Sequence, residues 1–296
     1  MDHQFHYVSN KQAELWLALH QRYSPSRTDL DCEKMYDQAF QRLAVEVGQV
    51  VQVIGLGCGG GHKDAQLLSA CSNQANHLRY VAADVSPTLV TEASTHVEQM
   101  LGKVPFTLRG LVADFMEAPD LGDYWNLEAA CNELNVFSFL GMLPNFEPKR
   151  ALGQLAQWVR SRDFLVLSAN LAPGSDYVLG CEKILPLYDN DETRLWLLCV
   201  MEELGFKVEI ADLEFFIAEH EGVKRVEAWL IFSEATSITY QDELFRFEKG
   251  ERFRLFYSNR FQPEGLNLIL EELGWKVVSQ HVTASGEEGV WVVGRS

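Results

Sequence analysis

The stretch from Val50 to Leu68, VVQVIGLGCGGGHKDAQLL, decides the fold of this chain. It begins with a mostly apolar, β-branched run, typical of a buried strand, and ends with apolar residues at helical spacing. Between these two patterns lie five glycines, Gly55, Gly57, Gly59, Gly60 and Gly61. Because glycine lacks a Cβ, such a loop lets backbone N–H groups and a helix N-terminus approach a ligand closely. The stretch therefore predicts a strand, a ligand-binding loop and a helix.

Strands and helices alternate on both sides of this loop. Apolar runs end at Asp84 and Asp114, further runs lie within 129–141 and 163–171, and helical patterns separate them. This order predicts a mostly parallel sheet with right-handed crossovers. After about residue 175 a helix and consecutive strands follow, and the chain ends in a hairpin over 276–296. We therefore predict an α/β fold, a Rossmann-like sheet with an antiparallel C-terminal hairpin and an inserted α+β subdomain.

The change of pattern divides the chain into two predicted parts. Residues 31–175 and 258–296 are expected to form the sheet domain that binds a cofactor. Residues 1–30 and 176–257 are expected to form a lid subdomain that binds the substrate. A chain of 296 residues has the size for one large domain with a smaller one embedded in it.

An excess of acidic side chains limits the partners of this protein. The chain has 42 acidic and 25 basic side chains, for a net charge of −17. A surface of this sign repels nucleic acid and anionic membranes, so we expect neither as a partner. We expect a small-molecule substrate instead, bound by a monomer or a weak dimer.

The sequence has no pattern for secretion, membrane insertion or metal binding. The N-terminal MDHQFHYVSNKQAELW lacks the basic and apolar regions of a signal peptide. No run approaches the roughly 18 apolar residues of a membrane span. The six cysteines form no CxxC pair and have no histidine at zinc-binding spacing. We therefore expect a cytoplasmic protein without a metal site.

Two cofactors fit the glycine loop. GLGCGG, from Gly55 to Gly60, satisfies the GxGxxG dinucleotide pattern, and Asp84 could bind ribose hydroxyls in either cofactor. Asp114 and Phe115 favour S-adenosylmethionine, because the carboxylate can accept from the adenine amino group while the ring lies against the base. The antiparallel hairpin also favours it. A nicotinamide-dependent oxidoreductase and a catalytically inactive binding protein stay open as alternatives.

Seven segments carry a resemblance to a known family. Four of them are YSPSRTD at 23–29, GLGCGGGHK at 55–63, AADVS at 82–86 and ADF at 113–115. The other three resemble the family's substrate-binding segments and are SFLGMLPNFEP at 138–148, LPLYDNDET at 185–193 and KGERFRLFYSNRF at 249–261. In all seven segments the chain resembles the histidine-specific Nα-methyltransferases of ergothioneine biosynthesis. That family is a branch of the class I S-adenosylmethionine-dependent methyltransferases. The resemblance covers nearly the whole chain and implies a methyltransferase.

The resemblance also implies two sets of site residues. The set implied for the methyl donor, with the neighbouring loop glycines, is Gly55, Gly57, Gly59, Lys63, Asp84, Asp114 and Phe115. Lys63 is expected to neutralise the donor's carboxylate. In the implied substrate set, Asn145 and Tyr188 hold an amino-acid carboxylate, and Tyr23 and Ser258 face the side chain. Tyr23 and Tyr188 are also the candidate catalytic residues, which would orient the amine.

The chain departs from the family pattern at two positions. The family has an acid two residues before Gly57, where this chain has Gly55, so ribose binding is expected to depend more on Asp84. Phe256 stands in the substrate set where the histidine-specific enzymes have a glutamate, two residues before Ser258. A phenyl ring cannot accept from an imidazole N–H, and leaving that group unpaired costs about 1–3 kcal/mol. We therefore expect N-methylation of a small amino-acid-like substrate other than histidine.

Overall fold

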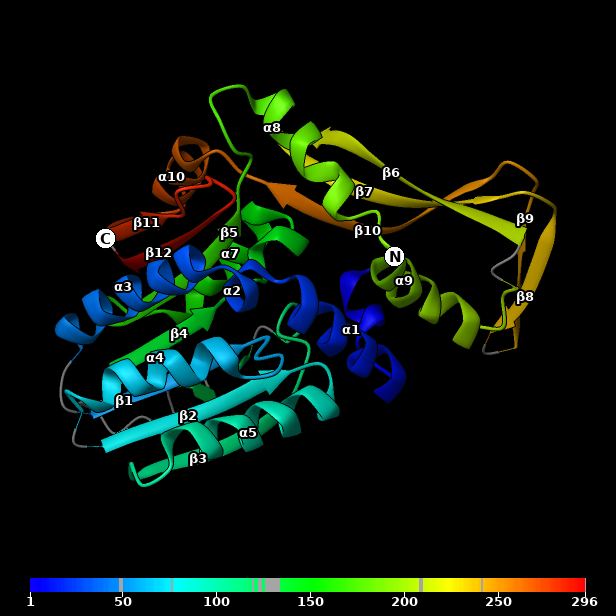
Figure 1. Ribbon diagram of the computed structural model, residues 1–296. Coiled ribbons are helices and arrows are strands. Elements are labelled where there is room, and N and C mark those ends of the chain that lie inside the picture. The colour runs from blue at the N-terminus through cyan, green and yellow to red at the C-terminus, as the bar shows by residue number, and fades with distance from the viewer. Residues whose placement is uncertain are drawn as a thin grey trace.

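A seven-stranded sheet forms the body of the molecule in the computed structural model (Figure 1). The structure describes residues 1–47, 50–75, 77–118, 120–121, 124–125, 134–207, 210–240 and 242–295. The strands, in their order across the sheet, are β11 (Trp275–Val282), β12 (Glu288–Arg295), β5 (Phe164–Asn170), β4 (Leu134–Phe139), β1 (Val50–Leu56), β2 (His77–Asp84) and β3 (Phe106–Val112). The five strands β1 to β5 are parallel, and β12 pairs antiparallel with both β5 and β11. This is the predicted Rossmann-like, mostly parallel sheet with its antiparallel C-terminal hairpin.

Helices cover both faces of this sheet (Figure 1). One face carries α3 (Leu30–Glu46), α4 (His62–Ser72) and α5 (Pro87–Leu101), and the other carries α7 (Pro148–Trp158) and α10 (Pro263–Glu272). α5 begins where the sequence dictates, because Pro87 occupies the first turn and Ser86 accepts the Leu89 N–H at 3.5 Å. The buried residues of each helix recur at three- and four-residue spacing, so each turns one apolar stripe to the sheet.

The inserted segment forms a second, antiparallel sheet that extends away from the first (Figure 1). It holds α8 (Tyr177–Ile184), η3 (Leu185–Leu187) and α9 (Asp191–Glu203), followed by β6 (Ala211–His220), β7 (Val223–Phe232) and β10 (Arg252–Arg260), with the hairpin β8 (Thr236–Tyr240) and β9 (Glu243–Phe247) between the last two strands. A separate core packs α9 against this sheet. The predicted boundary between residues 257 and 258 falls within β10.

The N-terminal residues are helical and pack against the inserted segment. They form η1 (His3–His6), α1 (Asn10–Tyr23) and α2 (Pro25–Thr28). Ser9 and Gln12 close a capping box at the start of α1, and both side chains also bond to Glu203 of α9. The terminal amine donates to the Arg254 carbonyl of β10 at 3.0 Å. Of the helices in the described residues, none is long and apolar enough to span a membrane.

Candidate active site

A cavity of about 350 Å³ opens at the carboxyl ends of the parallel strands, below the N-terminal segment, α9 and β10. Nearly all of the predicted site residues line it. They are Tyr23, Gly57, Gly59, Lys63, Asp84, Phe115, Asn145, Tyr188, Phe256 and Ser258. Gly55 and Asp114 are not among the lining residues. Ligands of open α/β sheets bind at this end of the strands, so the cavity lies where a cofactor is expected.

The glycine loop runs along one wall of the cavity. Gly57 and Gly59 have φ of +68° and +51°, in the left-handed region that favours glycine. The N–H groups of Gly57 and Cys58 donate to the Ala83 carbonyl at 2.8 and 3.0 Å, which ties the loop to β2. A Cβ on Gly59 would lie 2.7 Å from the Trp16 ring, so the loop is closely covered by α1.

Asp84, at the end of β2, anchors this loop. Its carboxylate accepts the Gly59 N–H and the Ser86 N–H, both at 3.1 Å, and only 7% of the residue is exposed. Burial raises the pKa of Asp84 to about 6. A carboxylate has about four lone-pair sites, so Asp84 can accept further hydrogen bonds besides those from the backbone. Asp84 lies on the cavity wall, and its role in ribose binding stays a prediction.

A second buried carboxylate, Asp64, belongs to the same wall and was not predicted. It lies in the first turn of α4, lines the cavity and accepts from Ser138 Oγ at 2.5 Å and from Tyr80 Oη at 2.7 Å. A Cβ built on Gly55 would lie 2.2 Å from Asp64 Oδ2, so this carboxylate occupies the space beside Gly55. A side chain at position 55 and the Asp64 carboxylate therefore cannot occupy this space together. The sequence feature that could have identified Asp64 is its position on the apolar face of α4, where an aspartate is unusual.

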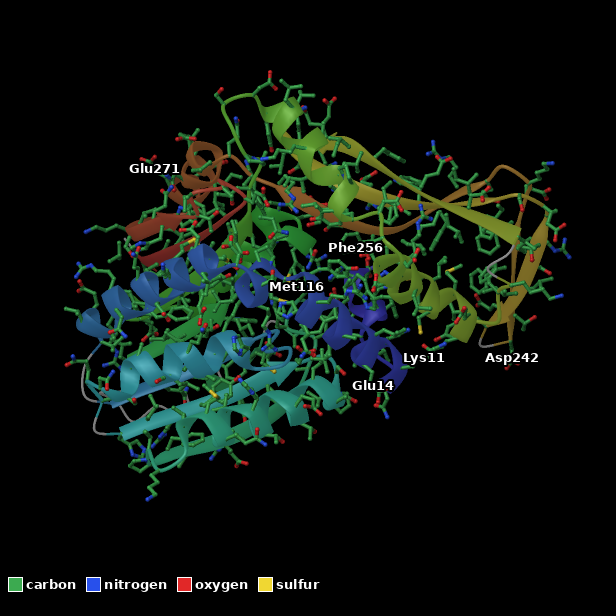
Figure 2. The ribbon with its side chains drawn as sticks, viewed as in Figure 1. Lys11, Glu14, Met116, Asp242, Phe256 and Glu271 are labelled. Atoms are coloured by element: carbon green, nitrogen blue, oxygen red, sulfur yellow. The ribbon has the colours of Figure 1, made fainter. Side chains whose placement is uncertain are left out.

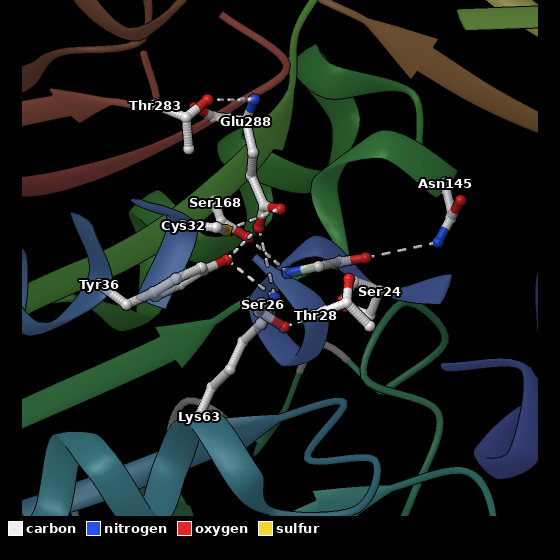
Figure 3. Close-up of polar contacts among 11 residues, drawn as sticks. Ser24, Ser26, Thr28, Cys32, Tyr36, Lys63, Asn145, Ser168, Thr283 and Glu288 are labelled. Carbon is white, nitrogen blue, oxygen red and sulfur yellow. Dashed lines mark hydrogen bonds and ion pairs between the residues drawn. The ribbon is translucent and has the colours of Figure 1, made fainter. Parts of the chain in front are cut away.

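Lys63 of α4 belongs to a buried polar cluster (Figure 3). Its Nζ donates to Tyr36 Oη at 2.8 Å and lies 3.4 Å from Glu288 Oε1, and the Tyr36 hydroxyl donates to the same carboxylate. Glu288 opens β12 and also lines the cavity. The charge of Lys63 is therefore opposed by a residue 225 positions away, which local sequence patterns do not reveal.

Asp114 and Phe115 follow β3. The third strand ends at Val112, two residues earlier than predicted, so Asp114 lies in the turn after it and accepts the Met116 N–H at 2.9 Å. Phe115 is 6% exposed, lines the cavity and packs edge-on to Phe139 with 5.6 Å between ring centroids. One edge of Phe115 therefore belongs to the core and another to the cavity.

On the opposite wall, Tyr188 and Ser258 form a hydrogen-bonded cluster. The Tyr188 hydroxyl donates to Ser258 Oγ at 2.9 Å and accepts from Arg260 Nη2 at 2.6 Å. Asn170, at the end of β5, donates to Ser258 Oγ at 3.3 Å. Tyr188 and Ser258 were predicted together from motifs 70 positions apart, and the fold brings them into contact. Arg260 and Asn170 were not predicted.

Tyr23 and Asn145 lie farther out on the cavity wall. The Tyr23 hydroxyl donates to Glu192 Oε2 at 2.8 Å, and 41% of the residue is exposed. This hydrogen bond raises the pKa of Tyr23. Asn145 closes the short helix η2 (Leu143–Asn145), and its amide donates to the Gly141 carbonyl at 3.5 Å (Figure 3). Both side chains are therefore held by contacts near the opening.

Phe256 of β10, labelled in Figure 2, packs against three other aromatic side chains. Its ring centroid lies 5.3 Å from that of His3, 5.8 Å from that of Trp196 and 6.3 Å from that of Tyr188. All four residues line the cavity, and Phe256 is 7% exposed. The position that holds a glutamate in the histidine-specific enzymes is therefore apolar here, as the sequence indicates. The contributions of His3 and Trp196 were not predicted.

Comparisons with known proteins place this site in a family. A family model described as histidine-specific methyltransferase, SAM-dependent, matches residues 18–293. The N-methyltransferase imqF of Aspergillus flavus is 24% identical over 277 residues, which are 90% of this chain and 73% of that protein.

Solved methyltransferase structures are also similar to the chain. An S-adenosylmethionine-dependent methyltransferase from Clostridium acetobutylicum is 11% identical, with a TM-score of 0.46, and the match covers 96% of this chain and 98% of that one. The CMeT domain of citrinin polyketide synthase is 12% identical, with a TM-score of 0.48 and coverage of 96% and 57%.

The family match spans both the glycine loop and the inserted segment. It gives no support to the nicotinamide-dependent alternative or to a catalytically inactive protein. The glycine loop, Asp84 and Phe115 also line one cavity. The chain therefore belongs to the histidine-specific family of methyltransferases, and S-adenosylmethionine is its methyl donor.

Proposed function

We propose that this methyltransferase methylates the amine nitrogen of a small, amino-acid-like acceptor. The observation that carries the proposal is the polar cluster of Tyr188 and Ser258, which shares one cavity with the glycine loop and Asp84. The name of the relative imqF, an N-methyltransferase, supports transfer to nitrogen. The description of the family, which names histidine, supports an amino-acid acceptor.

The donor end of the cavity is proposed to use the residues after β1, β2 and β3. Asp84 would accept from ribose hydroxyls, and Phe115 would lie against the base. Asp114 lies in the turn beside Phe115 but not among the residues that line the cavity, and it would reach the adenine amino group from the edge of the site. Gly57 and Gly59 would keep the loop backbone close to the donor, with Gly55 behind them beside Asp64. Lys63, whose Nζ lies 3.4 Å from Glu288 Oε1, would share its charge between Glu288 and the donor's carboxylate. When bound, the donor supplies a methyl group on a positively charged sulfur that is already activated for transfer. The protein's task is then to position the acceptor nitrogen behind that methyl group.

The acceptor end is proposed to hold both groups of an amino acid. Asn145 and Tyr188 would bind the carboxylate, and Tyr23 and Ser258 would face the side chain. The amine must be unprotonated to attack, and a tyrosine hydroxyl or a water molecule can relay the proton. The Tyr188 oxygen accepts one bond from Arg260 and can accept another, so it can orient an N–H of the amine.

Histidine is proposed to be a poor acceptor. Phe256 offers no hydrogen-bond acceptor where the histidine-specific enzymes have a carboxylate, and aromatic rings surround it. Burying an imidazole N–H without a partner costs about 1–3 kcal/mol. Acceptors with an apolar or aromatic side chain avoid that cost.

A screen of α-amino acids tests the proposal. Each would be incubated with enzyme and S-adenosylmethionine, and mass spectrometry would detect methylated product together with S-adenosylhomocysteine. We expect product from at least one amino acid. The kcat/KM for histidine should be about 5- to 150-fold lower than that for the preferred acceptor, which is the ratio that corresponds to the cost of about 1–3 kcal/mol for the unpaired imidazole N–H. A complete lack of product with every α-amino acid would contradict the proposal.

The variant Phe256→Glu provides the matched comparison. It restores the family's carboxylate and should raise turnover of histidine relative to the preferred acceptor. Phe256→Leu keeps an apolar side chain and should not. Binding of S-adenosylhomocysteine would confirm that both variants are folded. Equal histidine turnover in the two variants would exclude this residue as the determinant of specificity.

A further inference from the structure

Arg260, at the end of β10, is a buried cation on the cavity wall. It lines the cavity, and only 8% of the residue is exposed. Its Nη2 donates to Tyr188 Oη at 2.6 Å and its Nη1 to the Leu171 carbonyl at 3.3 Å. Its Nε is buried and has no hydrogen-bond partner among the residues that the structure describes. The guanidinium therefore keeps donor capacity that the protein leaves unused.

No carboxylate balances this charge within the described part of the chain. Four acids among the described residues line the cavity, and none of them forms an ion pair with Arg260. Glu288 is paired with Lys63 and Glu287 with Lys183, whereas Asp84 accepts from backbone N–H groups and Asp64 from two hydroxyls. The partners of Arg260 are a neutral hydroxyl and a backbone carbonyl. Burying a guanidinium without a counter-ion is costly, so a lone buried arginine that faces a cavity indicates an anionic ligand.

The groups around Arg260 suit a carboxylate. A guanidinium presents planar, parallel N–H donors whose spacing matches the two oxygens of a carboxylate. Tyr188 and Ser258 place hydroxyl groups beside it, and the Asn170 amide joins the same cluster. Phe256 and Tyr188 pack with 6.3 Å between ring centroids, which gives the acceptor an apolar surface next to the polar cluster.

We infer that Arg260 binds a carboxylate of the acceptor and supplies the positive charge that Asn145 and Tyr188 lack. The acceptor is then a carboxylate with an apolar or aromatic body, which lies against Phe256 and Trp196. This inference rests on the proposed function and adds the residue that fixes the charge of the substrate.

Binding of two probes tests the inference on the wild-type protein. Phenylacetate and phenylacetamide have the same shape but differ in charge. Calorimetry would measure each with enzyme saturated with S-adenosylhomocysteine. We expect phenylacetate to bind at least about tenfold more tightly than phenylacetamide, since a bond to a charged group is stronger than one to a neutral group. Equal affinity for the two probes, or no binding of either, would overturn the inference.

Variants of Arg260 identify the cation. Arg260→Met should lower phenylacetate affinity by about tenfold or more, and Arg260→Lys should retain part of it. Arg27→Met, which removes an exposed cation from the same cavity wall, should change the affinity by less than about threefold. Retention of affinity in Arg260→Met would overturn the assignment.

Stability separates a binding role from a structural one. If Arg260 serves to bind an anionic ligand, Arg260→Met removes an unpaired buried charge from the ligand-free protein. The melting temperature of the ligand-free protein should then be unchanged or higher. A lower melting temperature with unchanged phenylacetate affinity would mean a purely structural residue and overturn the inference. If the amino-acid screen gives no product while phenylacetate still binds through Arg260, the anion site stands and N-methylation of amino acids falls.

Discussion

Asp84 and Asp64 are two buried carboxylates on the donor wall, and each has a pKa raised by burial from 3.8 to about 6. A raised pKa means that the folded protein holds the proton more tightly than the unfolded chain does. The stability that each group contributes is therefore present below about pH 4 and is lost as the pH rises through about 6. A ribose hydroxyl of the methyl donor that donates to the ionised carboxylate offsets this loss of stability. We therefore expect the methyl donor to bind best above about pH 6, where the ligand-free protein is less stable.

The pH dependence of donor binding follows from Asp84. We predict that affinity for S-adenosylhomocysteine rises between pH 5 and about 6.5 and then levels off, because ribose hydroxyls donate to the ionised form. Asp84→Asn should flatten this dependence, and Asp84→Ala should abolish measurable binding. Calorimetry from pH 5 to 8 would measure both. If Asp84→Asn kept the pH step, Asp64 would be the titrating group instead.

At the scale of elements, the close approach of α4 to β1 shapes the donor wall. Gly55 of β1 leaves the space that the Asp64 carboxylate of α4 occupies. The hydroxyls of Ser138 and Tyr80 hold that carboxylate from the two neighbouring strands, β4 and β2. One glycine in a strand thus lets a helix contribute an acid to the cavity.

Substitution of Gly55 tests this packing. In Gly55→Ala the new Cβ would lie 2.2 Å from Asp64 Oδ2, so we predict a loss of about 1–3 kcal/mol in the free energy of unfolding and weaker donor binding. In Gly153→Ala the new Cβ would meet no described atom within 4 Å beyond its chain neighbours and its own helix backbone, so this variant should gain up to about 1 kcal/mol. Urea unfolding would measure both. The double variant Gly55→Ala with Asp64→Ala should recover part of the loss, and no recovery would place the clash elsewhere.

At the scale of the whole molecule, three distant segments close the acceptor side of the cavity. The N-terminal segment, α9 and β10 share one core, in which Trp196 Nε1 donates to the His6 carbonyl at 3.1 Å. His6 also bonds to the Leu255 carbonyl at 2.9 Å. His3 and Tyr7 of the same segment line the cavity. Because His3 packs against Phe256, we expect the first residues of the chain to contribute more to acceptor binding than to donor binding.

Removal of residues 1–8 tests this division of the molecule. We predict that the shortened protein binds S-adenosylhomocysteine within about threefold of the full chain, because the glycine loop and Asp84 are retained. Its affinity for phenylacetate should fall by about tenfold, since His3 and Tyr7 are lost from the cavity wall. Calorimetry would measure the two ligands on both proteins. Equal losses for both ligands would mean that the segment supports the whole cavity.

The sequence alone predicted the main sheet, its flanking helices and the glycine loop. These features are local, because strand and helix periodicity can be recognised within one segment and glycine marks the turn between them. The helix α1 was not predicted, because only Gln12 and Ala13 of it are buried and its apolar residues Leu15, Trp16 and Leu19 are only partly covered by the core. The motif residues Tyr188 and Ser258 were predicted by resemblance, and the structure brings them together.

Only the tertiary structure decided the charges of the site. Asp64 fills the space beside Gly55, Glu288 opposes Lys63, and Arg260 has no acidic partner among the residues described. Each of these facts depends on which distant elements meet. A sequence pattern reports burial along a single element, whereas the balance of buried charge is a property of the contacts between elements.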